Sequence, residues 1–145
     1  MIGLLQRVSE ASVTVDHEVI GRIGPGLLVL VGVQPDDTEA RGERLLERLL
    51  SYRVFEDEQG RMNRSLRDTG GGLLMVSQFT LAADTRSGTR AGFSTAAPPD
   101  MARELFAWLV HRARHQHPSV ACGRFGADMK VALVNDGPVT FWLES

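Results

Sequence analysis

Alternating apolar and polar positions dominate the first part of the chain. The segment ASVTVDHEVIGRI alternates on both sides of Asp16-His17, which predicts two strands joined by a turn at these residues. After the IGPG turn, the run from Leu27 to Val33 is almost wholly apolar, as is typical of a buried strand. Residues 2–33 are therefore expected to form strands.

Two later segments have the periodicity of helices. Asp36 and Glu39 have the spacing of a capping box, so a helix is expected to begin there. Pro98 and Pro99 introduce a second helix, which is expected to end before Pro118. The apolar stripes of the two segments are Leu45, Leu46, Leu49 and Leu50 in the first and Leu105, Phe106, Leu109 and Val110 in the second. Both stripes are expected to face a core.

The remaining segments are predicted to be short strands and loops. YRVFEDEQGRMN indicates a short strand and a turn near Gln59-Gly60, and GGLLMVSQFTL a mostly buried strand. A polar loop is expected over residues 82–97, and strands at about 119–125, 129–134 and 139–144. Strands in runs, separated by two main helices, favour an α+β fold with a mixed or largely antiparallel sheet. We expect one domain spanning residues 1–145.

Composition narrows the classes of function. With 145 residues the chain can bury a core without disulfides, and it has one cysteine, no signal peptide and no apolar run that could span a bilayer. A cytoplasmic protein without membrane contact is expected. The net charge of −2 offers no strong field to a polyanion, so a nucleic acid would have to contact a local patch. Two segments could form such a patch, one with Arg61, Arg64 and Arg67 and one with Arg86 and Arg90. Solvated loop charges explain both segments as well.

Several side chains could carry chemistry, but each has a simpler explanation. His111 and His115 are spaced to share one helix face, with His117 nearby, yet HRARHQH also fits the solvated side of an amphipathic helix. Cys122 fits a packed apolar group. Ser77 lacks the Gly-x-Ser-x-Gly elbow of a serine nucleophile. We expect no metal and no cofactor, since no phosphate loop or paired-carboxylate site is present.

Two motifs are more informative. SQFT ends a buried strand with Ser77, Gln78 and Thr80, which would place hydrogen-bonding groups at a sheet end, although ordinary strand-end capping explains it too. Gly137-Pro138 interrupts a segment that otherwise has the pattern of a strand, whereas Gly24-Pro25 lies where a plain turn is expected. The backbone at Gly137-Pro138 is therefore expected to turn or to be exposed.

Four fragments together resemble one known family. QRVSEASVTV, FEDEQGRMNRSL, SQFTL and GRFGADMKVALVNDGPVT occur in order between Gln6 and Thr140. In this the chain is similar to the bacterial D-aminoacyl-tRNA deacylases, once called D-tyrosyl-tRNA deacylases. The resemblance implies a barrel-like fold, a homodimer, and an aminoacylated tRNA bound at its 3′ acceptor end, without DNA.

The resemblance also implies roles for particular residues. Gly137-Pro138, with a cis peptide bond, would reach into the pocket of the partner subunit and act as a chiral filter, braced by Arg7. The residues implied to form the pocket are Ser77, Gln78, Phe79 and Thr80, with Phe125 beside them. A D-amino acid would point its side chain outward, whereas the L enantiomer would drive it into the Gly-Pro backbone. Glycine, which has no side chain to reject, would also enter.

The chemistry implied is RNA-assisted hydrolysis of the ester. The terminal ribose 2′-hydroxyl would orient or activate water, and the N–H groups of Phe79 and Thr80 would stabilise the oxyanion. The chain departs from the family at Ala82 and at Ala91-Gly92, which are expected near the pocket mouth. Two alternatives stay open: a binding module that does not hydrolyse, and a conventional esterase that uses Ser77 or Thr80 with a distant histidine.

Overall fold

The first strand organises the sheet because it has partners along both edges. A computed structural model describes residues 1–145. Strand β1 (Ile2–Val15) pairs antiparallel with β2 (Glu18–Ile23), β3 (Gly26–Gly32) and β8 (Lys130–Glu144). Beyond β3, β6 (Gly72–Ser77) and β7 (Val120–Cys122) continue the sheet in parallel. Asp16 and His17, at φ 49° and 65°, form the predicted turn between β1 and β2.

The sheet curls until its outer strands meet. The order is β2-β1-β3-β6-β7, yet β2 and β7 also approach each other, because a Cβ atom placed on Gly21 would lie 3.0 Å from the Cys122 carbonyl oxygen. A side chain on Gly21 would crowd that oxygen, so glycine suits this close approach. The inside of the curl holds a small core of eight buried residues: Val8, Ala11, Val13, Val15, Ile23, Leu28, Leu74 and Val76. The predicted α+β, barrel-like fold is thus confirmed, with a mixed sheet.

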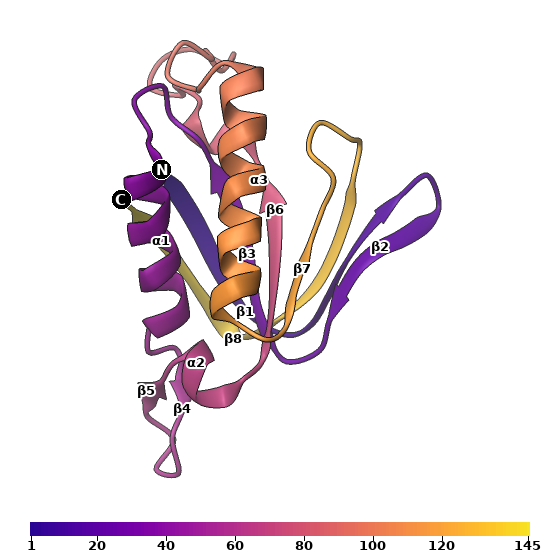
Figure 1. Cartoon of the computed structure of the whole chain (residues 1–145), viewed down its shortest axis with the longest axis vertical. Coiled ribbons are helices and arrows are strands. Elements are labelled where there is room, and N and C mark those ends of the chain that lie inside the picture. Colours follow the sequence, from indigo (N-terminus) through magenta and orange to yellow (C-terminus); the bar gives the residue numbers. More distant parts are fainter.

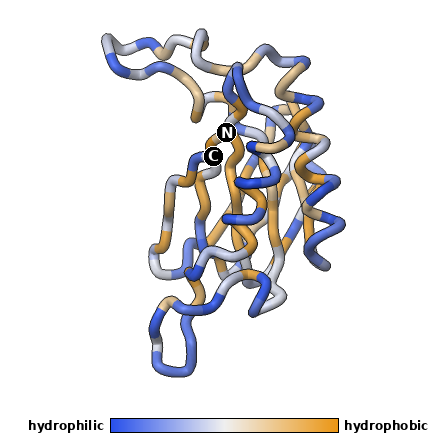
Figure 2. Tube along the Cα trace, turned by 60° about the vertical axis from the view of Figure 1, so that its left-hand side comes forward, coloured by the Kyte–Doolittle hydropathy of each residue, from blue (hydrophilic) through white to orange (hydrophobic).

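Two helices cover the outer face of this sheet and lie side by side (Figure 1). They are α1 (Glu39–Ser51) and α3 (Pro99–Gln116), and both predicted leucine-rich stripes are buried beneath them in a core of 22 residues. Arg112 of α3 donates a hydrogen bond to Glu43 of α1, with 3.0 Å between Nε and Oε2, and this contact lowers the pKa of the Glu43 carboxyl. Figure 2 shows hydrophobic colour along the strands and hydrophilic loops at the ends.

Three short elements complete the fold. A hairpin of β4 (Phe55–Glu56) and β5 (Met62–Arg64) turns at Gly60, as predicted. Helix α2 (Leu66–Thr69) is a third, unpredicted helix, whose Ser65 and Asp68 form a true capping box. After β6, residues Phe79–Ala82 form the 3₁₀ helix η1.

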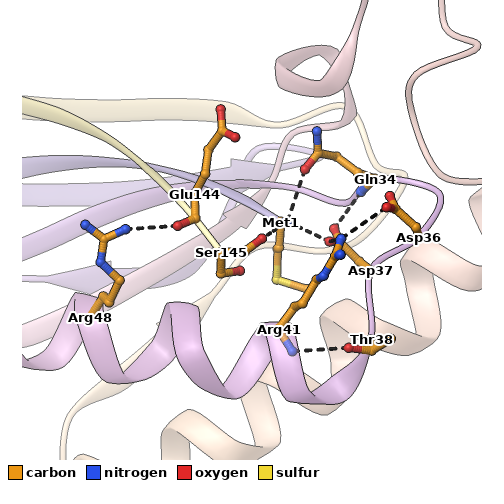
Figure 3. Close-up of polar contacts among 9 residues, drawn as sticks. All are labelled: Met1, Gln34, Asp36, Asp37, Thr38, Arg41, Arg48, Glu144 and Ser145. Carbon is orange, nitrogen blue, oxygen red and sulfur yellow. Dashed lines mark hydrogen bonds and ion pairs between the residues drawn. The ribbon is translucent and has the colours of Figure 1, made fainter.

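The start of α1 differs from the prediction. Its N-cap is Thr38, whose hydroxyl accepts a hydrogen bond from the Arg41 N–H at 3.2 Å, so the predicted capping box of Asp36 and Glu39 is wrong. The neighbouring Asp37 is fully buried and ion-paired with the Met1 ammonium at 2.6 Å (Figure 3). Met1 also donates to the Ser145 carbonyl at 3.1 Å, so both chain ends and the entry to α1 are held together.

The C-terminal strands also differ from the prediction. The segments expected at 129–134 and 139–144 form one strand, β8, which contains an irregularity, and β7 is shorter than expected. No helix of the structure combines the length and the apolar character that crossing a membrane requires.

Candidate functional site

A cavity of about 290 Å³ opens where strand β6 ends. It brings together four residues singled out in the sequence, Ser77, Gln78, Phe79 and Phe125, from segments far apart in the chain. The other lining residues are Val76, Gly126, Ala127, Met129 and Val131. A larger hollow of about 510 Å³ over β1, β2 and β8 contains none of the predicted site residues. The smaller cavity is therefore the candidate site.

The polar wall of the cavity is built by the transition from β6 to η1. The Gln78 N–H donates to the Val31 carbonyl at 2.7 Å, which ends the strand, and the first bond of η1 runs from the Leu81 N–H to the Gln78 carbonyl at 3.2 Å. The N–H groups of Phe79 and Thr80 precede that bond, so helix geometry gives them no acceptor within η1. The Gln78 side-chain amide donates to the Thr80 hydroxyl. Thr80 itself is exposed and does not line the cavity.

Phe125, in the loop between β7 and β8, also lines the cavity. Its ring packs 6.3 Å from that of Phe106 in the helical core, and the Arg103 guanidinium lies over it at 4.8 Å. Phe125 is thus held between the core and a cation.

The loop after η1 leads to Phe93, whose ring centroid lies 5.3 Å from that of the cavity residue Phe79. Asp84 and Gly92 exchange two backbone hydrogen bonds of 2.8 and 2.9 Å, which close residues 84–92 into a loop. Within it, hydrogen bonds from Arg86 lower the pKa of Asp84 from 3.8 to about 2, so this pair stays charged at neutral pH. Ala82 is buried and does not line the cavity, contrary to the expectation that it lies at the mouth. Ala91-Gly92 is exposed and does not line the cavity either.

Gly137-Pro138 lies in the irregular part of β8, opposite Arg7. Gln6 pairs with Thr140 and Val8 with Asn135, so the residues between Asn135 and Thr140 bulge away from the single residue Arg7. The peptide bond is cis, and both residues are exposed. Gly137 has φ 150°, and a Cβ atom there would lie 2.7 Å from the Val139 side chain. No other residue fits this position without strain.

Two side chains hold the bulge in place. Arg7 is buried, and its Nε donates to the Asp136 carbonyl at 2.8 Å while its Nη1 donates to the Val54 carbonyl at 2.7 Å. Asn135, which was not among the predicted site residues, accepts from the Val139 N–H at 2.8 Å and thus bridges the bulge. The sequence signal for Asn135 is its place two residues before Gly137-Pro138, since asparagine is common in turns.

Within one chain, the cavity and the Gly-Pro segment lie far apart on the sheet. Ser77 pairs with Val31, which pairs with Gly3, so the end of β6 lies at the level of Gly3 on β1. The Gly-Pro bulge lies at the level of Arg7 and on the other edge of β1, about 13 Å further along the strand. Neither Gly137 nor Pro138 lines the cavity.

The histidines and the cysteine lie outside the site. Nε2 of His111 is 3.1 Å from Nε2 of His115, and both are exposed. His117 is buried and its Nε2 is 2.6 Å from the Gly71 carbonyl oxygen. No group of three or more His, Cys, Asp or Glu side chains converges as a metal site would require. Cys122 packs against the helical core, as expected for an apolar group.

A curled mixed sheet backed by two helices, with a small cavity where β6 ends, places this molecule among α+β proteins and makes the end of β6 its candidate site. The chain matches the family described as D-Tyr-tRNA(Tyr) deacylase over residues 4–144, and it belongs to that family.

Two curated relatives agree with this assignment over nearly their whole lengths. A D-aminoacyl-tRNA deacylase of Stutzerimonas stutzeri is 66% identical over 145 residues, which is 100% of both chains. One of Thioalkalivibrio sulfidiphilus is 67% identical over 144 residues, covering 99% of this chain and 97% of its own. Among solved structures, a c-Myc DNA Unwinding Element Binding Protein has a TM-score of 0.95 at 39% identity, covering 100% of this chain and 99% of that one. A probable eukaryotic D-amino acid tRNA deacylase, at 17% identity and TM-score 0.88 over 99% and 98%, shares the fold.

Proposed function

We propose that the chain hydrolyses the ester bond of D-aminoacyl-tRNA and so removes D-amino acids from mischarged tRNA. The observation that carries this proposal is the full-length identity of about two thirds to relatives named D-aminoacyl-tRNA deacylase. The cavity supports it, since its volume of about 290 Å³ offers space for an amino acid and Phe79, whose N–H has no acceptor within η1, is among its lining residues.

In this proposal the catalytic groups are main-chain donors. The ester carbonyl lies against the N–H groups of Phe79 and Thr80, which stabilise the oxyanion that forms when water attacks. Within one chain, no histidine, carboxylate or cysteine lines the cavity, so the chain's own lining residues offer no side-chain base that would activate a serine or threonine. We therefore assign the orientation of water to the 2′-hydroxyl of the terminal ribose. Gln78 acts by holding the Thr80 hydroxyl.

The chiral filter is assigned to Gly137-Pro138 of a second chain in a homodimer. Within one chain the segment is separated from the cavity, but it is exposed and held by Arg7 and Asn135 from behind. A rigid, exposed backbone segment suits a test by exclusion, because it has no rotamer with which to yield to an L side chain. Glycyl-tRNA, with no side chain, is accepted under the same rule.

A nucleic-acid-binding module without turnover is the competing function, and one relative in fold is described as a DNA-element binding protein. Hydrolysis of D-tyrosyl-tRNA and of L-tyrosyl-tRNA, followed at one enzyme concentration, distinguishes the two. Rapid loss of the D ester alone supports the deacylase. Equal loss of both means an unselective esterase, and loss of neither means a binding module.

A further inference from the structure

Two aromatic side chains stand half exposed, side by side, next to the cavity. Phe79 is 56% exposed and Phe93 is 51% exposed, and their ring centroids are 5.3 Å apart with the planes tilted by 50°. Phe79 also lines the cavity, whereas Phe93 does not, so the pair extends from the cavity wall to the exposed surface. Exposed rings that adjoin a cavity mark a binding surface more often than scattered apolar residues do.

The backbone around Phe93 holds its ring in this position. Gly92, the preceding residue, exchanges two hydrogen bonds with Asp84, and the Phe93 carbonyl accepts from the Ala96 N–H at 3.1 Å. The Thr95 hydroxyl donates to the Ala82 carbonyl, which ties this segment to η1. The aromatic pair is therefore organised before any ligand arrives, which reduces the entropy lost on binding.

The charges near the pair suit a nucleotide. Arg86 is neutralised by Asp84 at 2.8 Å, whereas Arg90, in the same loop, has no carboxylate partner. Arg103, which lies over Phe125 of the cavity lining, has none either. Exposed aromatic faces together with free guanidinium groups are typical of surfaces that bind single-stranded nucleic acid by stacking its bases.

We infer that Phe93, paired with Phe79, stacks the nucleobase of the nucleotide whose ribose carries the aminoacyl ester. This inference rests on the proposed function, since it takes the amino acid to lie in the cavity beside Phe79. The ribose and base then extend out of the cavity toward Phe93. A stacked ring contacts the face of a base and not its hydrogen-bonding edge, so Phe93 does not distinguish one base from another. Phe93 is a positioning residue that contributes to binding.

The test is binding of an RNA hairpin with the acceptor-end sequence, carrying D-tyrosine through a 3′-amide that water does not cleave. A second hairpin lacks only the terminal base. Wild type, Phe93→Ala and Phe93→Tyr are compared, with Val19→Ala, an exposed apolar residue of β2, as the control variant. Because Phe93 is half exposed, the variants are expected to fold, and thermal unfolding verifies this.

In wild type, Val19→Ala and Phe93→Tyr, removal of the base is expected to weaken binding about 5- to 150-fold, the range for one stacked base. In Phe93→Ala the two hairpins are expected to bind almost equally. Equal sensitivity to the base in Phe93→Ala and wild type overturns the inference. If wild type hydrolyses D-tyrosyl-tRNA but binds both hairpins alike, the inference alone fails. If it neither hydrolyses nor binds, the proposed function fails with it.

Discussion

Replacement of Arg7 is expected to weaken both the fold and the chiral filter. Its guanidinium donates one hydrogen bond to the Asp136 carbonyl and one to the Val54 carbonyl, at 2.8 and 2.7 Å. Hydrogen bonds from a charged donor contribute about 1.5–3 kcal/mol each. Arg7 is buried without a carboxylate partner, so its removal also relieves a desolvation cost. We therefore expect Arg7→Met to lower the free energy of unfolding by about 2–4 kcal/mol.

Replacement of Arg7 is also expected to change selectivity, because the Asp136 carbonyl that it binds directly precedes the Gly-Pro segment. Gly137 comes directly after it, and a Cβ atom on Gly137 would lie only 3.3 Å from the Arg7 guanidinium, so the side chain packs against the back of the segment. If the segment excludes L-amino acids by its position, loosening it raises hydrolysis of the L ester. We expect Arg7→Lys, which reaches one carbonyl at most, to lower the ratio of D to L hydrolysis at least about tenfold, equivalent to 1.4 kcal/mol.

Urea unfolding measures the loss of stability, and parallel hydrolysis of D- and L-tyrosyl-tRNA measures the ratio. Arg48→Met is a matched control, because Arg48 donates to another carbonyl of β8, that of Glu144 at 2.9 Å, in an exposed contact. It is expected to change the free energy of unfolding by less than about 0.5 kcal/mol and to leave the ratio unchanged. An Arg7→Lys protein that is destabilised but keeps the wild-type ratio would refute the bracing role.

The other predictions concern the chemistry, the buried amine and metals. Thr80→Ala is expected to keep its hydrolysis rate within about tenfold of wild type, whereas a lost nucleophile costs about 10⁴-fold or more, and single-turnover kinetics separates these outcomes. Asp37→Asn leaves the buried Met1 ammonium without its ion pair and is expected to cost about 3–5 kcal/mol in urea unfolding; the exposed Asp36→Asn should cost almost nothing, and equal losses would contradict the argument. A chelator is expected to leave D-ester hydrolysis unchanged; inactivation reversed by Zn²⁺ would instead implicate His111 and His115.

Local patterns predicted most of the fold because its elements follow from apolar periodicity. The stripe of α1, the turn at Asp16-His17 and the buried strand before Gln78 need no knowledge of distant residues. The prediction for the N-cap of α1 was wrong because Thr38, and not Asp36, accepts from the Arg41 N–H, while the Asp36 carboxylate pairs with the Arg41 guanidinium. The single strand β8 was missed because Arg7 and Asn135 hold the bulge, and only Asn135 is near it in sequence.

The candidate site was predicted in its parts but not in its arrangement. Ser77, Gln78, Phe79 and Phe125 line one cavity, whereas Thr80 lies outside it, and the roles of these residues stay predictions. The pairing of Phe93 with Phe79 depends on the Asp84–Gly92 bridge, which no spacing rule reveals. Sequence motifs identify residues by type and order, but the walls and rim of a cavity depend on which loops fold back.

In the proposed homodimer, the cavity of one chain works with the Gly-Pro segment of the other. The direct test is co-expression of two variants with different tags: Arg7→Lys, with a loosened segment, and Ala127→Phe, whose cavity is filled. In the purified mixed dimer, the open cavity belongs to the Arg7→Lys chain and is covered by the intact segment of the other. If the two chains share each site, the ratio of D to L hydrolysis returns toward that of wild type. A ratio equal to that of Arg7→Lys alone would contradict it.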